Sequence, residues 1–461
     1  MHILTASLAI LSVDSLAQQG VATQSSGDYY PDHNACQGIS PIAHKTYRPL
    51  KHARLQKMSI MMRHGDRVPV SLLQGDSTSY LLCNNPLETT SVSSPPGVYH
   101  GSTSYASPSM RNKIVASPEE NLYAAAGAAY YWPNSNCEID QLTGRGAAQT
   151  RAIGERLREI YVDLLHFLPH DLLKHPDDVL YLRNTNVLRT KISAANAFEG
   201  LYPERFRKGK QAVSLVTFPQ SIETLTLNPV ACPKLGAIYQ GFVRSPVHAA
   251  HIKENAVLMV KANTVLGVAL DPRYNTTLQG GQVLPRLCNK LSLCHVTNPK
   301  NCISPQEAQT LMEKSTFLYS RFLRVDVPGA GSSEIAKRLA AGPFLKNIAD
   351  SIRGTLASDK KNGHHKVYRP FELYSAHDQS LDQVLSVVAE PNTPWPAYAS
   401  TVIFELWQKK KGKSVVRVLH EGRVVPANKN LKCALDAYPV EVFLQFIESY
   451  VPKNTVAECA L

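Results

Sequence analysis

The sequence has 461 residues, of which 44% are hydrophobic and 19% are charged, as is ordinary for a globular protein with a large core. This length allows one large domain with an insertion, or two domains. The net charge of +12 and the pI near 9.2 favour anionic partners or a solvated basic surface. No nucleic-acid-binding motif accompanies the charge, so we expect no nucleic-acid partner.

The N-terminal segment predicts entry into the secretory pathway. Residues 3–13 form a short apolar run, and Ser15-Leu16-Ala17 follows as a candidate cleavage site. The run is too short to span a bilayer, so we expect residues 1–17 to be a signal peptide. No Lys or Arg precedes the run, which leaves a shortened membrane anchor as the alternative. No other stretch predicts a stable membrane span.

The next part of the chain predicts one strand between two irregular segments. Residues 18–50 are rich in Gln, Ser, Gly, Tyr and Pro, and are expected to form an extended lead-in tied down by Cys36. The apolar, partly alternating residues 55–62 predict a buried strand. Residues 70–137 are loop-rich, and we expect either a surface excursion or a rim over a functional site.

Helices and strands alternate after this segment. Thr143 is the expected N-cap of a helix whose apolar residues recur at helical spacing over 147–164. Strands are predicted at 178–182 and 213–218, with a second helix around 192–201 between them. This alternation indicates a parallel α/β sheet.

The alternation stops after the third strand and resumes near the C-terminus. Residues 226–345 predict mostly helices and no clear strand, as expected of an inserted helical subdomain. We therefore predict an α/β three-layer sandwich with a mainly parallel sheet, built from 51–225 and 346–461. Its later elements are strands at 371–375, 400–407 and 414–419, and helices at 381–388 and 440–451.

The nine cysteines are scattered along the chain, which predicts disulfides formed in an oxidising compartment. The odd number leaves one cysteine unpaired or paired between chains. Cys288, Cys294, Cys302 and His295 could alternatively bind a metal, but their spacing matches no standard zinc pattern, so we expect disulfides and no metal. A sequon at Asn275 predicts glycosylation, which agrees with the same compartment.

Three predicted strands end in polar residues that can share one crevice. Arg63-His64, Arg183 and His377-Asp378 stand at these ends, and Arg189 begins the helix that follows the second of them. Of these residues, Arg183 is expected to have a structural or supporting role. The carboxyl ends of parallel strands face one crevice, and a helix N-terminus adds hydrogen-bond donors there. The sequence thus predicts a positively charged pocket that holds two histidines and one carboxylate.

These residue types suit the hydrolysis of a phosphate ester. Arginine forks bind phosphate oxygens by paired hydrogen bonds, and histidine can accept a phosphoryl group. A carboxylic acid can give the leaving alkoxide its proton. No metal is required if the arginines carry the charge.

Several motifs resemble those of the histidine acid phosphatases, a branch of the histidine phosphatase superfamily. Arg63-His64-Gly65-Asp66-Arg67-Val68-Pro69 resembles their RHGxRxP signature, and Ser375-Ala376-His377-Asp378 resembles their HD motif. Residues 183–190 resemble the middle segment of the family, although they begin Arg-Asn-Thr-Asn instead of the usual Arg-Ser-Thr-Asp. The resemblance runs from about residue 54 to residue 450.

The resemblance implies an enzyme, a phosphoric monoester hydrolase that forms a phosphohistidine intermediate and uses no cofactor. It implies His64 as the nucleophile and Asp378 as the proton donor. The phosphate ligands that it implies are Arg63, Arg67, Arg189 and His377.

The sequence is compatible with several substrates. Residues 374–378, 402–407 and 287–302 resemble a Golgi phosphatase that removes phosphate from xylose in the glycosaminoglycan–protein linker of proteoglycans. A phosphorylated glycan is therefore one expected substrate, in the Golgi lumen, in the lysosome or outside the cell. The alternatives are a broad-specificity secreted or lysosomal acid phosphatase, a phosphotransferase, and a non-enzymatic binder of polyanions or glycans. The oligomeric state is also open, with a homodimer as one alternative.

Overall fold

A computed structural model describes residues 35–38, 47–70, 78, 80–83, 110–114, 137, 139–207, 213–266, 272–295, 297–329, 331–358, 369–431 and 433–461. For 110–114, 272–279 and 411 only the backbone is described. The predicted signal peptide and most of the predicted lead-in lie outside the described residues.

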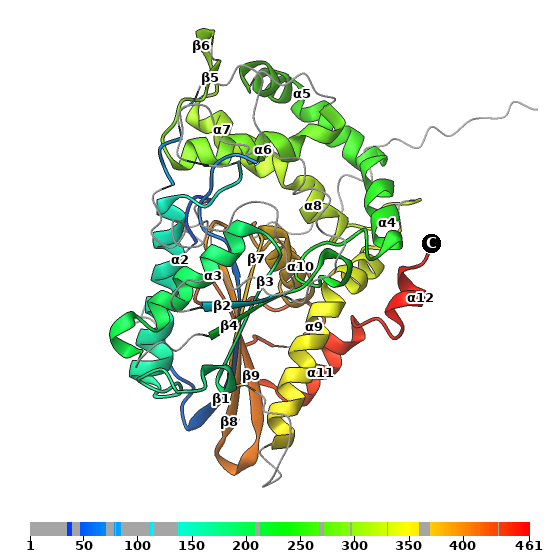
Figure 1. Ribbon diagram of the computed structural model, residues 1–461. Coiled ribbons are helices and arrows are strands. Elements are labelled where there is room, and N and C mark those ends of the chain that lie inside the picture. The colour runs from blue at the N-terminus through cyan, green and yellow to red at the C-terminus, as the bar shows by residue number, and fades with distance from the viewer. Residues whose placement is uncertain are drawn as a thin grey trace, which may run out of the picture.

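Within this part of the chain, a nine-stranded mixed sheet forms the centre of the molecule (Figure 1). The strand order is β10-β9-β8-β1-β7-β3-β4-β2, and β11 pairs with β9. The neighbouring strands β1, β7, β3, β4 and β2 pair in parallel. The pairs β1–β8, β8–β9, β9–β10 and β9–β11 are antiparallel. The strands are β1 (Ala53–Arg63), β2 (Met110–Ile114), β3 (Leu180–Asn184), β4 (Val213–Thr217), β7 (Phe371–Ala376), β8 (Thr401–Lys409), β9 (Ser414–His420), β10 (Arg423–Val424) and β11 (Tyr438–Pro439).

Helices cover both faces of this sheet and make it the middle of three layers. Because β1 is buried on both faces, its side chains enter two cores. Ile60 and Met62 pack toward α2 and α3, whereas Met61 packs toward α9 and α10 on the other face. The helices of these two layers are α2 (Gly144–Leu157), α3 (Leu188–Leu201), α9 (Ser333–Ser358), α10 (Asp378–Val388) and α11 (Val440–Ser449).

The α/β fold predicted from the sequence is confirmed, and the predicted strands and helices correspond to elements of this sheet and its two layers. Thr143 caps α2, since its side chain accepts a hydrogen bond from the backbone N–H of Gly146. Several elements were not predicted. The strand β2 has three polar residues in its middle and therefore no apolar pattern, and a small hairpin lies within the region where no strand was expected. The two-residue strands β10 and β11 and a short C-terminal helix were also missed.

The α-helices between β4 and α9 gather toward one end of the sheet, at the top in Figure 1. The long α9 runs across residue 345, so the division into a core and an inserted subdomain stays a prediction. Asn275 lies in α6 among the residues described by backbone alone, and its glycosylation stays a prediction as well. The elements of this region are α4 (Pro233–Val243), α5 (Pro246–Leu266), α6 (Pro272–Cys288), β5 (Cys294–His295), β6 (Asn298–Cys302), α7 (Pro305–Ser315) and α8 (Phe317–Phe322).

Eight of the nine cysteines form disulfides, and Cys433 is exposed and free. The disulfide prediction is confirmed, and the alternative of a metal at Cys288, Cys294 and Cys302 is excluded because each of these sulfurs is bonded. Disulfides indicate an oxidising compartment such as the secretory pathway. Among the helices that the structure describes, none has the length and apolarity needed to cross a membrane. The bonded pairs are Cys36–Cys288, Cys83–Cys137, Cys232–Cys459 and Cys294–Cys302.

The disulfide Cys232–Cys459 ties the C-terminal helix α12 (Thr455–Cys459) to the residue before α4. We expect the double substitution Cys232→Ser, Cys459→Ser to lower the free energy of unfolding by about 2–4 kcal/mol, because the unfolded chain regains the entropy of the open loop. Urea unfolding of the full chain measures this loss. The matched control Cys433→Ser should stay within about 0.5 kcal/mol of the parent, and equal stability of both variants would contradict the prediction.

Candidate active site

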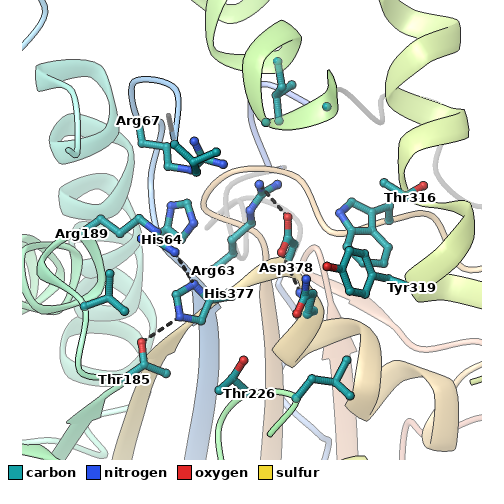
Figure 2. Close-up of a pocket in the computed structure, with 18 of the residues that line it drawn as sticks. Arg63, His64, Arg67, Thr185, Arg189, Thr226, Thr316, Tyr319, His377 and Asp378 are labelled. Atoms are coloured by element: carbon teal, nitrogen blue, oxygen red, sulfur yellow. Dashed lines mark hydrogen bonds and ion pairs between the residues drawn. The ribbon is translucent and has the colours of Figure 1, made fainter. Parts of the chain in front are cut away.

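The sheet brings the predicted site residues together at the carboxyl ends of three neighbouring strands. In the parallel pairs, Arg63 of β1 lies opposite Ala376 of β7, and Asn184 of β3 lies opposite Ser375 of β7. The residues that follow these strand ends therefore share one edge of the sheet. Figure 2 shows the resulting cluster, with His64, His377 and Asp378 beside the arginines.

The loop after β1 is held in place by the first turn of α2. Gly65 and Gly146 approach so closely that a Cβ atom on either residue would collide with backbone atoms of the loop or the helix. The buried Asp66 carboxylate accepts hydrogen bonds from the Thr143 hydroxyl at 2.9 Å and from the Asn289 amide at 2.7 Å. These contacts fix the backbone that carries His64 and Arg67.

Two carboxylates hold the three arginines of the cluster. Arg63 forms an ion pair with Asp378 at 2.8 Å. Asp140 pairs with two guanidinium groups, those of Arg67 at 3.2 Å and Arg189. The cations come from a loop, a strand end and a helix start, and without these carboxylates they would repel one another. The paired carboxylates therefore set the positions of the arginines.

Arg63 is also fixed by the loop that precedes β8. Its guanidinium donates a hydrogen bond to the carbonyl of Pro396 at 2.8 Å and lies 4.3 Å from the ring centroid of Tyr398. A cation over an aromatic face is stabilised by the charge distribution of the ring. The guanidinium is therefore oriented before any ligand binds.

The His64 imidazole is buried and uncharged. Its Nδ1 donates to the backbone carbonyl of Gly65 at 2.7 Å, so the lone pair of the neutral ring is on Nε2. Burial, followed by the positive charges of Arg189 and Arg63, lowers the pKa of His64 well below 6.5. The ring keeps a free lone pair in mildly acidic solution, as a nucleophile requires.

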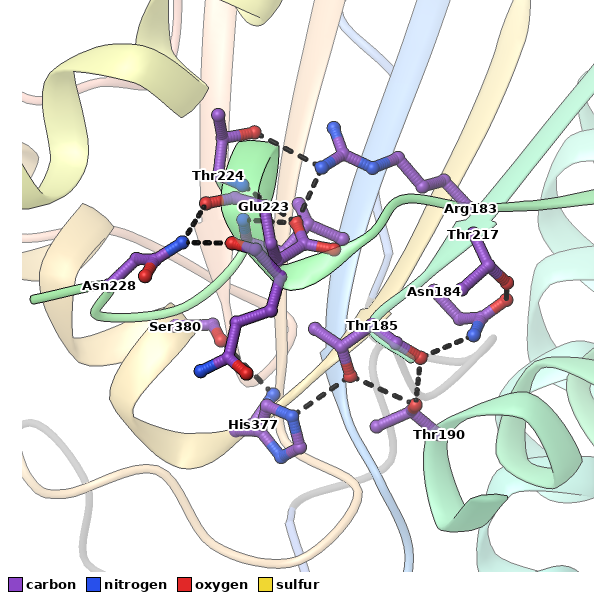
Figure 3. A network of polar contacts seen from close by, with 12 residues as sticks. Arg183, Asn184, Thr185, Thr190, Thr217, Glu223, Thr224, Asn228, His377 and Ser380 are labelled. Carbon is purple, nitrogen blue, oxygen red and sulfur yellow. Dashed lines mark hydrogen bonds and ion pairs between the residues drawn. The ribbon is translucent and has the colours of Figure 1, made fainter. Parts of the chain in front are cut away.

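His377 belongs to a chain of hydrogen bonds that Figure 3 shows. Its Nδ1 lies 3.2 Å from an Nη of Arg189, which can only donate, so the His377 proton must be on Nε2. Nε2 lies 2.9 Å from the hydroxyl of Thr185, which lies 3.0 Å from the hydroxyl of Thr190. Thr190 in turn donates to the carbonyls of Thr185 and Val187. Arg189 therefore sets the tautomer of His377, and the two threonines fix the orientation of its ring.

The charges of the cluster also act on His377 and Asp378. Burial and the charge of Arg189 lower the pKa of His377 to about 3. Burial alone would raise the pKa of Asp378, but the charge of Arg63 and the backbone N–H of Gln379 outweigh it and lower that pKa. Arg63 therefore holds Asp378 as a carboxylate in the free protein.

The structure brings six predicted residues into one cluster and leaves a seventh out. Arg183, at the end of β3, lines a different cavity. Its guanidinium pairs with Glu223 of the pocket wall and stacks on Phe218, with the guanidinium carbon 3.9 Å from the ring centroid. Although the end of β3 was expected at the crevice, the Arg183 side chain does not enter the cluster, because successive side chains of a strand alternate between faces. The six clustered residues are Arg63, His64, Arg67, Arg189, His377 and Asp378.

Two residues that support the cluster were not predicted from the sequence. Asp140 precedes the predicted helix cap and has a positive φ of 64°, and only the fold shows that it holds two arginines. Thr185 lies in a segment that the sequence singles out, but its bond to His377 depends on the pairing of β3 with β7. The cluster opens into a pocket of about 510 Å³.

Comparisons with known proteins show the family of the chain. Residues 54–421 match the family model of the histidine phosphatase superfamily (branch 2). A protein named "Probable acid phosphatase" of Schizosaccharomyces pombe is 27% identical over 79% of this chain and 75% of its own. Human lysosomal acid phosphatase is 26% identical, covering 72% of this chain and 74% of its own. Human 2-phosphoxylose phosphatase 1 is 24% identical, covering 80% and 71%.

A solved structure shows the same fold at low sequence identity. The phytase of Hafnia alvei superposes with a TM-score of 0.51 and 14% identity, covering 90% of this chain and all of its own. The family model and the acid phosphatase relatives identify a phosphoric monoester hydrolase. The chain belongs to the histidine phosphatase superfamily, branch 2.

Proposed function

We propose that this protein is an acid phosphatase of the secretory pathway that hydrolyses phosphate monoesters in two steps through a phosphohistidine at His64. One observation supports this most strongly. A neutral imidazole with a free Nε2 lies in a cluster of three guanidinium groups and a second histidine. Guanidinium groups match the charge and geometry of phosphate oxygens, and the free nitrogen can attack phosphorus.

In the first step, His64 Nε2 bonds to phosphorus and the bond from phosphorus to the ester oxygen breaks. Asp378 gives that oxygen its proton, and the alcohol leaves. In the second step, Asp378 takes a proton from water, the water oxygen bonds to phosphorus, and the phosphorus–nitrogen bond breaks to release inorganic phosphate. The remaining members of the cluster bind the phosphoryl oxygens: Arg63, Arg67, Arg189 and His377.

The Arg63–Asp378 ion pair explains how the acid becomes protonated. A phosphate that binds Arg63 competes with Asp378 for this cation and brings negative charge beside the carboxylate. Both changes favour the protonated form and raise the pKa of Asp378. The carboxyl group is then ready to donate when the ester oxygen lies beside it.

The substrate proposal follows from the relatives. Because they include 2-phosphoxylose phosphatase 1 as well as lysosomal acid phosphatases, we propose phosphoxylose in the proteoglycan linker as one substrate and a broad range of monoesters as the alternative. A phosphate-release screen tests this with phosphoxylosyl linker glycan, inositol phosphates, nucleotides, lysophosphatidate and an aryl phosphate. Release without an added acceptor alcohol supports hydrolysis. No release from any of these esters would overturn the proposed function.

Thr185 should act as a positioning residue for His377. We expect Thr185→Val to lower kcat/KM for an aryl phosphate about tenfold, the effect of one lost hydrogen bond in a buried site. Thr185→Ser keeps the hydroxyl and should stay within about twofold of the parent. A threefold or larger loss in the serine variant would indicate that the methyl group of Thr185, through packing, matters more than its hydroxyl.

The depressed pKa of His64 should be visible without turnover. Diethyl pyrocarbonate reacts with neutral imidazole, so its inactivation rate reports the fraction of uncharged His64. Because the folded-state pKa is lowered, we expect the rate to hold as the pH falls through 6.5 and to decline only below it. Inorganic phosphate should protect against the reagent. A rate that halves at pH 6.5 would contradict a buried, uncharged His64.

A further inference from the structure

We infer that the pocket beside His64 selects monophosphates of neutral alcohols that carry an apolar or aromatic face, and excludes substrates that carry several phosphates. The inference rests on the proposed function and deepens it by naming the class of leaving group. It follows from the wall of the pocket beyond the arginine cluster, where charge is scarce and aromatic rings are exposed to the cavity.

The cations of the pocket are gathered at one end. Among the described residues that line it, the only lysine or arginine side chains are Arg63, Arg67 and Arg189. The described lining therefore offers guanidinium groups to a single phosphate group.

Carboxylates take up part of this positive charge. Asp378 and Asp140 pair with the three guanidinium groups. Farther along the wall is Glu223, whose Oε1 pairs with Arg183 and whose buried Oε2 accepts no hydrogen bond from the described residues. A second phosphate on the same substrate would lose its hydration there, beside a carboxylate whose cationic partner is already engaged.

The wall next to Asp378 is aromatic. Tyr319 of α8 and Trp395 have ring centroids 6.4 Å apart with planes tilted by 35°, and Figure 2 shows Tyr319 on the side of the pocket where Asp378 lies. Because Asp378 is the proposed donor to the ester oxygen, the alcohol part of the substrate must lie on this side. The rings therefore face the leaving group and not the phosphate.

Apolar side chains continue this wall. Phe218 is held by its stacking on Arg183, and it lies between the pocket and the neighbouring cavity, since it lines both. The other apolar side chains among the described lining residues are Val70, Val187, Leu227, Leu284 and Met312. An apolar ring or a sugar face that leaves water for this wall gains binding free energy in proportion to the area it buries.

Two matched pairs of substrates test the inference on the full-length protein. Benzyl phosphate and ethyl phosphate are both alkyl esters with one phosphate, and they differ in the apolar ring. We expect benzyl phosphate to have the higher kcat/KM by about tenfold to a hundredfold. myo-Inositol monophosphate and myo-inositol hexakisphosphate differ in the number of phosphates, and we expect at least a tenfold preference for the monophosphate.

Substitutions in the wall should change the preference for the apolar ring. Trp395→Ala and Tyr319→Ala should each reduce the preference for benzyl over ethyl phosphate at least threefold. The exposed Val257, with 87% of its surface accessible, provides the control Val257→Ala, which should leave the ratio unchanged. If Trp395→Ala and Tyr319→Ala both keep the parent ratio, the aromatic wall does not contact the leaving group.

A gain of function tests the charge argument. Gln220 is exposed at the pocket lining, and Gln220→Lys should raise the ratio of hexakisphosphate to monophosphate turnover at least threefold, less so at high salt. The same change at the exposed Gln309 of α7, Gln309→Lys, should not move the ratio. An equal effect of both lysines would attribute it to net charge and overturn the charge argument.

The outcomes separate this inference from the proposed function. If no ester releases phosphate, both the proposed function and this inference are wrong. If kcat/KM is equal for benzyl and ethyl phosphate, or equal for inositol hexakisphosphate and monophosphate, the protein is still a phosphatase and only the inference about substrate class is overturned.

Discussion

His64→Ala should abolish phosphate release and lower kcat by on the order of 10⁵-fold, because no other group can bond to phosphorus at that place. The same variant should no longer become labelled when the protein is mixed with a radioactive phosphate ester and quenched in base, where phosphohistidine is stable. The alanine removes an uncharged ring, so we expect the fold to survive the change. Thermal unfolding of the variant checks this.

The control for His64→Ala is His170→Ala, at a histidine that is 69% exposed and does not line the pocket. It should keep both turnover and labelling. If the His64 variant retained full activity, the two-step mechanism would be wrong. If it lost turnover but kept the label, another residue would be the nucleophile, and His377 would be the first to examine.

Asp378→Asn should slow the hydrolysis of alkyl phosphates by about 10²–10⁴-fold, the usual contribution of a general acid. Aryl phosphates should lose far less in the first step, since a phenolate leaves without a proton. Comparing single-turnover rates of ethyl phosphate and 4-nitrophenyl phosphate isolates this step. Asparagine keeps the size of the side chain and can still accept a hydrogen bond from Arg63, so a change in shape does not explain a difference between the esters.

The matched control for the acid is Asp350→Asn on the exposed face of α9, where the carboxylate pairs with Lys346 in water. It should change neither rate. Equal losses for the alkyl and aryl esters in the Asp378 variant would remove Asp378 as the proton donor. They would leave it a role in orienting Arg63.

Much of the site could be predicted because its residues directly follow buried strands. The apolar runs that become β1 and β7 locate Arg63 and His377 at strand ends without any knowledge of pairing. The cap at Thr143 likewise depends only on local sequence. Local sequence therefore predicted β1, β3, β4, β7, β8 and β9, and together with the family resemblance it predicted six residues of the cluster.

What could not be predicted depends on contacts between distant segments. Arg183 and Asn184 both end β3, and only the pairing of β3 with β7 shows that Arg183 faces the other cavity. Asp140 pairs with two arginines that lie 73 and 49 residues away in sequence (140 − 67 and 189 − 140). The strand β2 has too few apolar residues to show a pattern, and it is found only through its pairing with β4.

The parallel pairing of β1 with β7 also has a consequence for how the protein folds. It joins residues more than 300 positions apart, since Arg63 lies opposite Ala376. The entropy lost in closing so large a loop is offset only when most of the chain is in place, so such contacts form late. His64 and Asp378 therefore meet only after synthesis of the chain has passed β7, and partly folded chains have no hydrolytic activity. Recovery of turnover during refolding should accordingly lag behind the recovery of helical signal.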